Sequence, residues 1–445
     1  MTIQHPKNMG MRVFIIIWFG QMVSLIGSGL TNFALGVWVY QQTGSVTQFA
    51  LISLFTSLPT ILISPVAGAF IDRWPRRWVM IISDFGAGLS IGVIAFLFTI
   101  GHLATWHIYI ATAVSSCFSA FQWPAYAAAT TILIPKHNLS RANGMLQLGD
   151  AMARLVSPLL GGVLLATIQL QGIILIDFTT FIFALLTLVQ VRFPKGIVDV
   201  HKPEKTSLIK EVTYGLTYIL HRPGLLGLLV FFAITNFLVG VVQILVTPLV
   251  LSFASPTALG SILTIGGVGM LASSVVMSTY KGPQQRIKSV FGFMLLGGLC
   301  IMAAGLHRSV PLLALIAFLF FFGQPIINSS TLVIFQKKVA PNVQGRIFAL
   351  ISAITNASLP FAYVVAGPLA DRIFEPLMIE GGPLAGSIGK IIGVGSGRGI
   401  GLMFIVMGGL TVLVTVIAYQ YCPLRLVEHQ LPDAFEDGAT AIAEI

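Results

Sequence analysis

The chain has 445 residues, of which 56% are hydrophobic and only 9% are charged, and its mean hydropathy is +0.91. Soluble domains carry about 25% charged residues, so this composition excludes a soluble protein and indicates an integral membrane protein. The formal net charge of +10 resembles that of nucleic-acid-binding proteins, but membrane topology explains it better, and we expect no nucleic-acid partner.

The apolar runs are each about 20 residues or longer, which predicts membrane-spanning helices, since barrel strands would alternate over about ten residues. The first run is also too long for the apolar core of a cleavable signal peptide. The expected spans lie at residues 13–40, 46–71, 78–100, 106–134, 141–168, 172–191, 224–252, 257–280, 287–306, 310–336, 344–370 and 399–422. The sequence therefore predicts an all-α membrane protein with twelve transmembrane helices.

The placement of basic residues supports an even number of spans. If both termini are cytoplasmic, 20 of the 25 Lys and Arg residues fall on the inner side and four on the outer side. Arg154 alone falls within a span. Cytoplasmic loops of membrane proteins carry such an excess of Lys and Arg, so we expect both ends of the chain inside.

The chain divides into two halves of six spans. We expect an N-terminal bundle at 1–192, a cytoplasmic linker at 193–223, a C-terminal bundle at 224–422 and a disordered acidic tail at 423–445. Apolar residues recur at helical spacing over 205–220, which predicts an amphipathic helix on the inner membrane surface.

The two halves also echo each other in sequence. Pro124 in span four matches Pro325 in span ten, offset by 201 residues, and Pro158 matches Pro360, offset by 202. These offsets indicate a duplicated unit and two pseudo-symmetric six-helix bundles. Parallel repeats of this kind place a substrate site between the halves near the midplane.

A dense charge cluster closes span two: Gly68-x-x-x-Asp72-Arg73-x-x-Arg76-Arg77. Gly68 permits close helix approach, and Asp72 can accept hydrogen bonds from helix N-terminal amides or pair with an arginine. We interpret the cluster as a latch for one conformation. The alternative is that the arginines only set topology.

Span five carries the pattern Ser157-Pro158-x-x-Gly161-Gly162. Pro158 removes one backbone hydrogen bond, and the two glycines allow close packing and bending. The alternative is that the pattern reflects ordinary helix packing.

Charged residues within spans are costly and are usually functional. Asp150 and Arg154 are four residues apart, so they share a helix face, where they can form a structural pair or a proton-linked switch. Asp177, near the outer end of span six, is a second candidate for the proton. Asp84 lies in span three nearer the inner side and is a further candidate for proton coupling, although we expect it rather to support the adjacent loop that carries Arg73, Arg76 and Arg77.

Polar and aromatic residues within apolar runs are candidates for a substrate cavity, although each can instead bridge two helices by a hydrogen bond. With few charges, such a cavity suits a bulky, amphipathic or weakly cationic substrate. The candidates are Gln21, Asn32, Gln122, Trp123, Tyr126, Asn236, Gln243, Gln324, Asn328 and Asn356.

Enzymatic functions find little support. The sequence has no Walker loop, its histidines make no metal pair, and the three cysteines are far apart within or near apolar runs. We therefore expect neither an enzyme nor a cofactor or metal site.

Twelve spans in two halves, with the Gly68–Arg77 cluster after span two, resemble the major facilitator superfamily. Pro75 departs from that pattern, because the family usually has glycine there. Span five is similar to the antiporter motif of the family's drug exporters, with Ser157 in place of a usual glycine. The stretches 21–34 and 40–45 resemble the macrolide-efflux and enterobactin-exporter branch.

The resemblance implies the major facilitator fold and a secondary active exporter of bulky amphipathic molecules, drug- or macrolide-like or siderophore-like, by proton antiport with alternating access. It implies a monomer in a bacterial-type inner membrane, with a small-molecule substrate, protons and the lipid bilayer as partners. Span four lacks the arginine of many proton antiporters, which leaves the proton relay open. The alternatives are a lysophospholipid or lipid transporter, and a non-transporting membrane receptor or scaffold.

Overall fold

The computed structural model describes residues 9–71, 74–135, 138–191, 216–279, 285–339 and 343–430, and every regular element in these ranges is helical. The described residues confirm the predicted all-α class. Most of the expected amphipathic helix at 205–220 and the greater part of the acidic tail lie outside them.

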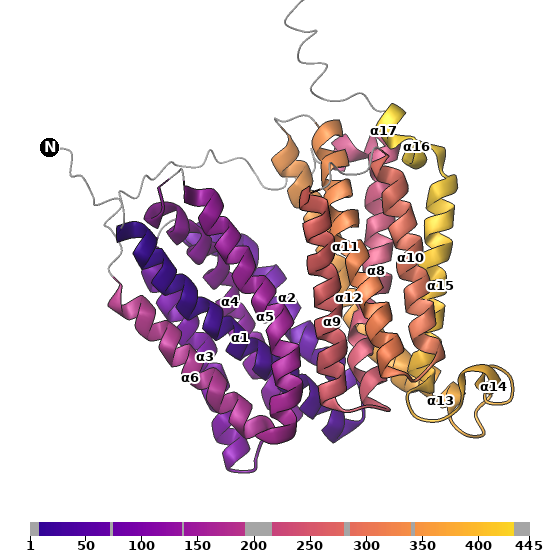
Figure 1. Ribbon diagram of the computed structural model, residues 1–445, viewed down its shortest axis with the longest axis horizontal. Coiled ribbons are helices and arrows are strands. Elements are labelled where there is room, and N and C mark those ends of the chain that lie inside the picture. Colours follow the sequence, from indigo (N-terminus) through magenta and orange to yellow (C-terminus); the bar gives the residue numbers. More distant parts are fainter. Residues whose placement is uncertain are drawn as a thin grey trace, which may run out of the picture. The chain divides into compact units, whose positions relative to one another are not determined.

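Within these described ranges, twelve long helices follow the predicted spans, with ends that differ by a few residues (Figure 1). They are α1 (Met9–Thr43), α2 (Val46–Ile71), α3 (Arg76–Thr99), α4 (Thr105–Leu133), α5 (Leu139–Thr167), α6 (Gln169–Gln190), α8 (Pro223–Leu251), α9 (Pro256–Thr279), α10 (Arg286–Leu306), α11 (Val310–Lys338), α12 (Gln344–Leu369) and α15 (Arg398–Gln420). Shorter elements are η2 (Ala370–Phe374), α13 (Glu375–Met378), α14 (Gly389–Ile392), α16 (Cys422–Arg425) and α17 (Val427–Gln430).

Among the long helices, eleven contain a described segment that is long and apolar enough to cross a membrane. The remaining one is α4, which carries several Ser and Thr side chains and Gln122. These polar residues lower its hydropathy, and most of them line a cavity of unit 1.

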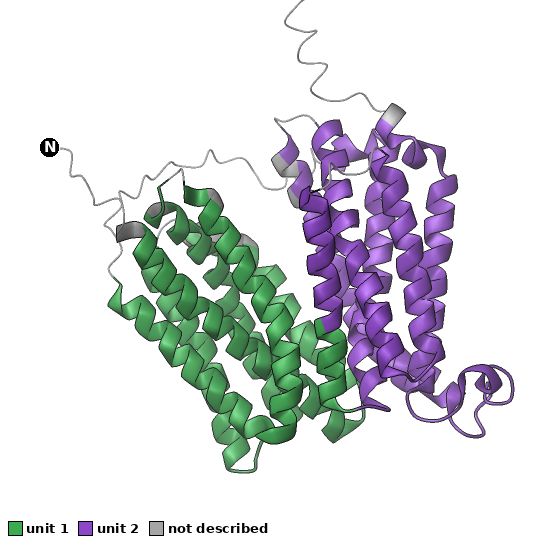
Figure 2. Ribbon diagram, viewed as in Figure 1, with its two compact units in different colours: residues 1–201, 255–264 green, residues 202–254, 265–445 purple. Residues whose placement is uncertain are grey.

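The chain forms two compact units (Figure 2). Unit 1 comprises residues 1–201 and 255–264, and unit 2 comprises 202–254 and 265–445. The boundary near residue 201 falls within the predicted linker at 193–223. In addition, the first part of α9 clusters with unit 1, although its remainder belongs to unit 2.

Four helix pairings recur in the two units. In unit 1, α1 packs against α5 and α6, and α3 packs against α4 and α6. In unit 2, α8 packs against α12 and α15, and α10 packs against α11 and α15. Each unit thus pairs its first helix with its fifth and sixth, and its third with its fourth and sixth. This repetition agrees with the duplication inferred from the proline offsets.

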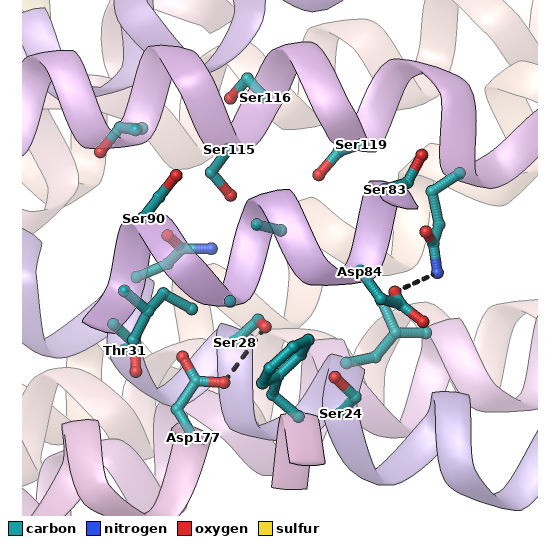
Figure 3. A pocket seen from close by; sticks show the side chains of 18 of the residues that line it. Ser24, Ser28, Thr31, Ser83, Asp84, Ser90, Ser115, Ser116, Ser119 and Asp177 are labelled. Carbon is teal, nitrogen blue, oxygen red and sulfur yellow. Dashed lines mark hydrogen bonds between the residues drawn. The ribbon is translucent and has the colours of Figure 1, made fainter. Parts of the chain in front are cut away.

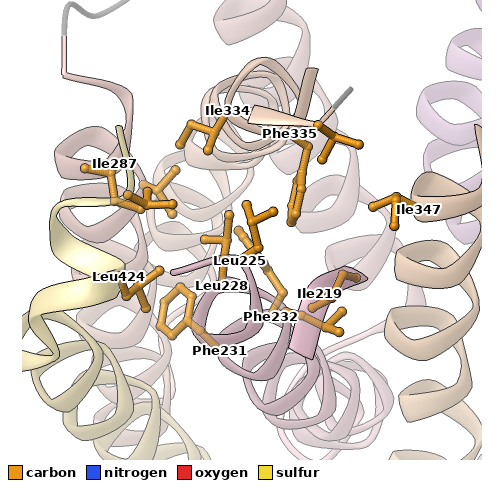
Figure 4. Packing of buried hydrophobic residues seen from close by; sticks show 14 of the residues in the cluster. Ile219, Leu225, Leu228, Phe231, Phe232, Ile287, Ile334, Phe335, Ile347 and Leu424 are labelled. Carbon is orange, nitrogen blue, oxygen red and sulfur yellow. The ribbon is translucent and has the colours of Figure 1, made fainter. Parts of the chain in front are cut away.

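Buried apolar residues fill the core of unit 2 where α8, α10, α11 and α12 converge (Figure 4). Leu424 and Val427 from the C-terminal end of the chain are 1% and 0% exposed in this cluster. The expectation of a disordered tail from residue 423 therefore does not hold for residues up to 430, because α16 and α17 dock against the bundle.

Glu428 fixes that docking by polar contacts. Its carboxylate accepts hydrogen bonds from the backbone amides of Arg286 (3.3 Å) and Ile287 (3.0 Å), the first residues of α10. The Lys338 ammonium donates to the Glu428 carbonyl oxygen at 2.7 Å. Glu428 thus acts as an N-terminal cap for α10, since the first amides of a helix have no partner within it.

Candidate functional site

A cavity of about 420 Å³ lies within unit 1 and is lined by residues of α1, α2, α3, α4 and α6 (Figure 3). Its wall contains two carboxylates, Asp84 and Asp177, and no Lys, Arg or His among the described lining residues. The wall also carries many hydroxyl groups: Ser24, Ser28, Thr31, Thr56, Thr60, Ser83, Ser90, Thr112, Ser115, Ser116 and Ser119.

Asp84 is held by two amides from neighbouring helices. Gln21 Nε2 donates to Asp84 Oδ2 at 2.8 Å, and Gln122 Nε2 donates to Asp84 Oδ1 at 2.5 Å. Gln122 Nε2 also lies 2.8 Å from Gln21 Oε1. Asp84 is 8% exposed, and a buried carboxylate needs such donors. Its contacts thus lie at the cavity, whereas the sequence analysis placed it in support of the arginine loop.

Asp177 is fully buried at another part of the cavity and has a poorer set of partners. Ser28 Oγ donates to Asp177 Oδ1 at 3.2 Å, whereas Asp177 Oδ2 has no hydrogen-bond partner among the described residues. The Thr31 hydroxyl lies beside this carboxylate and is itself buried without a hydrogen bond in the described part of the chain. Gly27 allows the close approach of α1, because a Cβ there would lie 3.0 Å from Asp177 Oδ1.

Asp150 and Arg154 lie on α5 but do not line the cavity. Arg154 is exposed and Asp150 is half-buried, and no ion pair joins these two described side chains. Asp150 instead lies near enough to Tyr126 to act electrostatically on its hydroxyl, which is buried without a hydrogen-bond partner among described residues.

The predicted cavity residues separate into two groups. Asn32, Gln122, Trp123 and Tyr126 line the unit 1 cavity, as does Gln21. The other five lie on helices of unit 2 and are absent from the described wall of this cavity: Asn236, Gln243, Gln324, Asn328 and Asn356.

Sequence reasoning missed the hydroxyl groups, although α4 contained a usable signal. Thr112, Ser115, Ser119, Gln122 and Tyr126 follow one another at intervals of three or four residues. That spacing places them on one helix face, and all five line the cavity. A polar stripe along a span predicts a helix face that lines a polar cavity, just as an apolar stripe predicts a helix face that packs in a core.

Of the charge cluster after span two, Arg76 and Arg77 are described, while Asp72 and Arg73 lie outside the described residues. The Arg77 guanidinium donates to the backbone oxygens of Leu188 (3.2 Å) and Val189 (2.7 Å) in the last turn of α6. A cation there satisfies carbonyls that have no partner within the helix. Arg77 therefore ties the start of α3 to the end of α6.

The residues of the span-five motif make close contacts on α5. Ser157 Oγ donates to the backbone oxygen of Ile26 on α1 at 3.1 Å. A Cβ at Gly161 would lie 2.8 Å from a ring carbon of Phe33, and one at Gly162 would lie 2.6 Å from the backbone oxygen of Pro256. Small residues are thus required at both glycine positions.

Pro158 belongs to the same contact region. A Cβ at Gly260, in the part of α9 that belongs to unit 1, would meet the Pro158 carbonyl oxygen. The Thr264 hydroxyl donates to the backbone oxygen of Leu155 at 3.0 Å, one helical turn before Pro158. The motif therefore combines a missing backbone donor with tight packing, as its residue types indicated.

Residues 17–363 match the family described as the Major Facilitator Superfamily. The chain belongs to this superfamily. Among its relatives, macrolide efflux protein A of Streptococcus pyogenes is 27% identical over 367 residues, covering 81% of this chain and 90% of the relative. The multidrug efflux pump Tap of Mycolicibacterium fortuitum is 24% identical over 367 residues, covering 80% and 89%.

Solved transporter structures share the fold at low sequence identity. A mutant of the nucleoside transporter NupG aligns with a TM-score of 0.68 and 13% identity, covering 92% of this chain and 100% of that one. A bacterial homologue of the iron transporter ferroportin, in an inward-facing state, aligns with a TM-score of 0.65 and 15% identity, covering 92% and 98%. The superfamily member described here is therefore a multi-pass membrane transporter with the major facilitator fold, not an enzyme.

Proposed function

We propose that this transporter is a secondary active exporter of bulky, amphipathic or weakly cationic small molecules, drug- or macrolide-like or siderophore-like. The observation that carries the proposal is the unit 1 cavity, whose described wall combines two carboxylates and aromatic side chains with no basic group. Such a wall attracts a cation and accommodates apolar surface beside it. Relatives named as macrolide and multidrug efflux proteins support the direction of transport.

Proton antiport with alternating access is the mechanism that we propose for coupling. Buried carboxylates within spans, as Asp84 and Asp177 are, are common in proton relays of transporters. Asp150 and Arg154 remain further candidates for the switch on α5. The sequence has no Walker loop that would supply ATP hydrolysis, so an ion gradient is the energy source that fits.

We further propose a monomer in a bacterial-type inner membrane with both termini in the cytoplasm. The excess of Lys and Arg in the loops assigned to the inner side supports this orientation.

The test uses purified protein in proteoliposomes that contain a pH-sensitive dye and carry an imposed pH gradient. The panel comprises erythromycin, tetraphenylphosphonium, ferric enterobactin and a lysophospholipid, with protein-free liposomes as the control. We expect erythromycin or tetraphenylphosphonium to dissipate the gradient and to be transported against its own gradient. Transport of the lysophospholipid alone would favour the lipid transporter, and no transport of any compound would favour the receptor or scaffold.

A further inference from the structure

The two carboxylates of the unit 1 cavity differ in how their oxygens are satisfied. Both oxygens of Asp84 accept a hydrogen bond from an amide, one from Gln21 and one from Gln122. Asp177 accepts one bond, from Ser28, and its Oδ2 atom has no partner among the described residues although the residue is 0% exposed. Two groups of one chemical type thus occupy different environments in one cavity.

We propose that these carboxylates divide the work of coupled transport: Asp177 carries the coupling proton, and Asp84 is the anionic anchor for the cationic group of the transported molecule. The assignment rests on the proposed function. It adds a binding residue for each of the two exchanged species, the proton and the transported molecule.

The surroundings of Asp177 can accommodate a proton. Placed on Oδ2, it removes the charge of a fully buried carboxylate and creates an O–H group. The Thr31 hydroxyl beside it is also buried, and it can donate to the ionised carboxylate or accept from the protonated one. The Ser28 and Thr31 hydroxyls can therefore stay hydrogen-bonded to Asp177 in both protonation states, whereas only the protonated state removes the buried charge. A metal cation would need more oxygen ligands than Asp177, Ser28 and Thr31 offer.

Asp84 has the features of an anchor for a cation. Amide donors from two helices hold its carboxylate in place, and further lone pairs remain for a ligand. The Gln122 Oε1 atom is buried without a partner among described residues, so it can accept from an N–H group of the same ligand. Trp123 and Tyr126 line this cavity and present aromatic rings, which attract cations.

Among the described residues, other charged groups near Asp177 are few. Asp84 and Tyr126 are the other titratable side chains in the described cavity wall. Of the helices packed against α6, α3 contributes Arg77, which contacts Leu188 and Val189 at the end of α6, about three turns from Asp177. On α5, Asp150 is a neighbour of Tyr126 and Arg154 is exposed.

The first experiment separates binding from coupling with tetraphenylphosphonium as the probe. Asp177→Asn, Asp84→Asn and Asp150→Asn are compared with the wild type, and Glu380→Gln serves as a control at an exposed carboxyl outside the cavity. We expect Asp177→Asn to lose gradient-driven uptake by at least about tenfold while it keeps equilibrium binding and counterflow, which need no net proton transfer. We expect Asp84→Asn to lose binding and counterflow as well.

Three outcomes would overturn the assignment. Reversal of the phenotypes of Asp84→Asn and Asp177→Asn would exchange the roles. Loss of gradient-driven uptake in Asp150→Asn, with uptake unchanged in Asp177→Asn, would assign the coupling proton to Asp150 on α5. If the wild-type protein transports other compounds of the panel but does not bind tetraphenylphosphonium, Asp84 is not an anchor for a cation.

The second experiment needs no substrate, so its failure is distinguishable from failure of the proposed function. Infrared difference spectra of the purified protein report the carbonyl stretch of a protonated carboxyl group. We expect a buried protonated-carboxyl band in the wild type and in Asp84→Asn that is absent from Asp177→Asn. A band that persists in Asp177→Asn, in protein whose thermal unfolding matches the wild type, would contradict the proton assignment even if transport is confirmed.

Discussion

At the scale of single residues, Gln122 joins α4 to both α1 and α3. Its amide nitrogen contacts Asp84 Oδ1 and Gln21 Oε1, so one side chain supports a carboxylate that lies within a membrane span. Removal of that donor leaves a buried carboxylate oxygen without its partner. The cavity wall therefore depends on a residue that the sequence identified only as a candidate.

Gln122→Leu is expected to lower the free energy of unfolding by about 1–3 kcal/mol, the cost of leaving a buried polar group unsatisfied. Thermal unfolding in detergent measures the change. Gln147→Leu on the exposed face of α5 is the control, because its side chain lies outside the cavity. Equal unfolding temperatures for the two variants would show that the hydrogen bond from Gln122 to Asp84 contributes little to stability.

At the scale of helices, α1 and α5 approach closely where Gly29 faces Ser157. A Cβ at Gly29 would lie 2.7 Å from the Ser157 Cβ atom, which is closer than side chains pack. The serine that departs from the family's usual glycine is thus accommodated by a glycine on the opposite helix.

Gly29→Ala is expected to destabilise the protein by about 1–3 kcal/mol through overpacking. Ser157→Gly in the same chain removes the facing side chain and should restore most of that loss. Gly144→Ala is the matched control, since no atom lies within 4 Å of a Cβ built there. Additive losses in the double variant, measured by thermal unfolding, would show that the two positions do not interact.

Another helix-scale feature is the cap of α10 by Glu428. The loop before α10 has no aspartate like Asp72, and the carboxylate at this helix start comes instead from the C-terminal end of the chain. Glu428→Ala is expected to lower stability by about 0.5–2 kcal/mol, as loss of an N-terminal cap does. Glu380→Ala is the control, and an unchanged unfolding temperature for Glu428→Ala would argue against the cap.

At the scale of the whole molecule, the distribution of basic residues predicts which loops face outward. Ser387, in the exposed loop before α15, is expected on the outer side, and Lys337, at the end of α11, on the inner side. Ser387→Cys in a variant without the native cysteines should react with an impermeant maleimide on intact cells. Lys337→Cys should react only after permeabilisation, and the reverse result would invert the topology.

The sequence predicted the helices well and the cavity less well, for a physical reason. Apolar length is a local property, so each span could be located from its own residues. Which face of a helix meets a cavity depends on its neighbours, and therefore Asp84 was expected to support the loop after span two although it lines the unit 1 cavity. The five polar candidates on unit 2 stay predictions. Ser28 and Thr31 could not be identified from the sequence, because their role depends on Asp177, which lies on a helix far away in the sequence.

The polar stripe on α4 has a consequence for how the protein is made. A helix whose residues include Thr112, Ser115, Ser116, Ser119 and Gln122 partitions less readily into lipid than its neighbours do. In the folded unit, α4 packs against α2 and α3, which precede it in synthesis and bracket it with apolar surface. We therefore expect α4 to enter the membrane together with these helices. The helix that supplies much of the cavity's polar lining is then also the helix that depends most on its neighbours for membrane insertion.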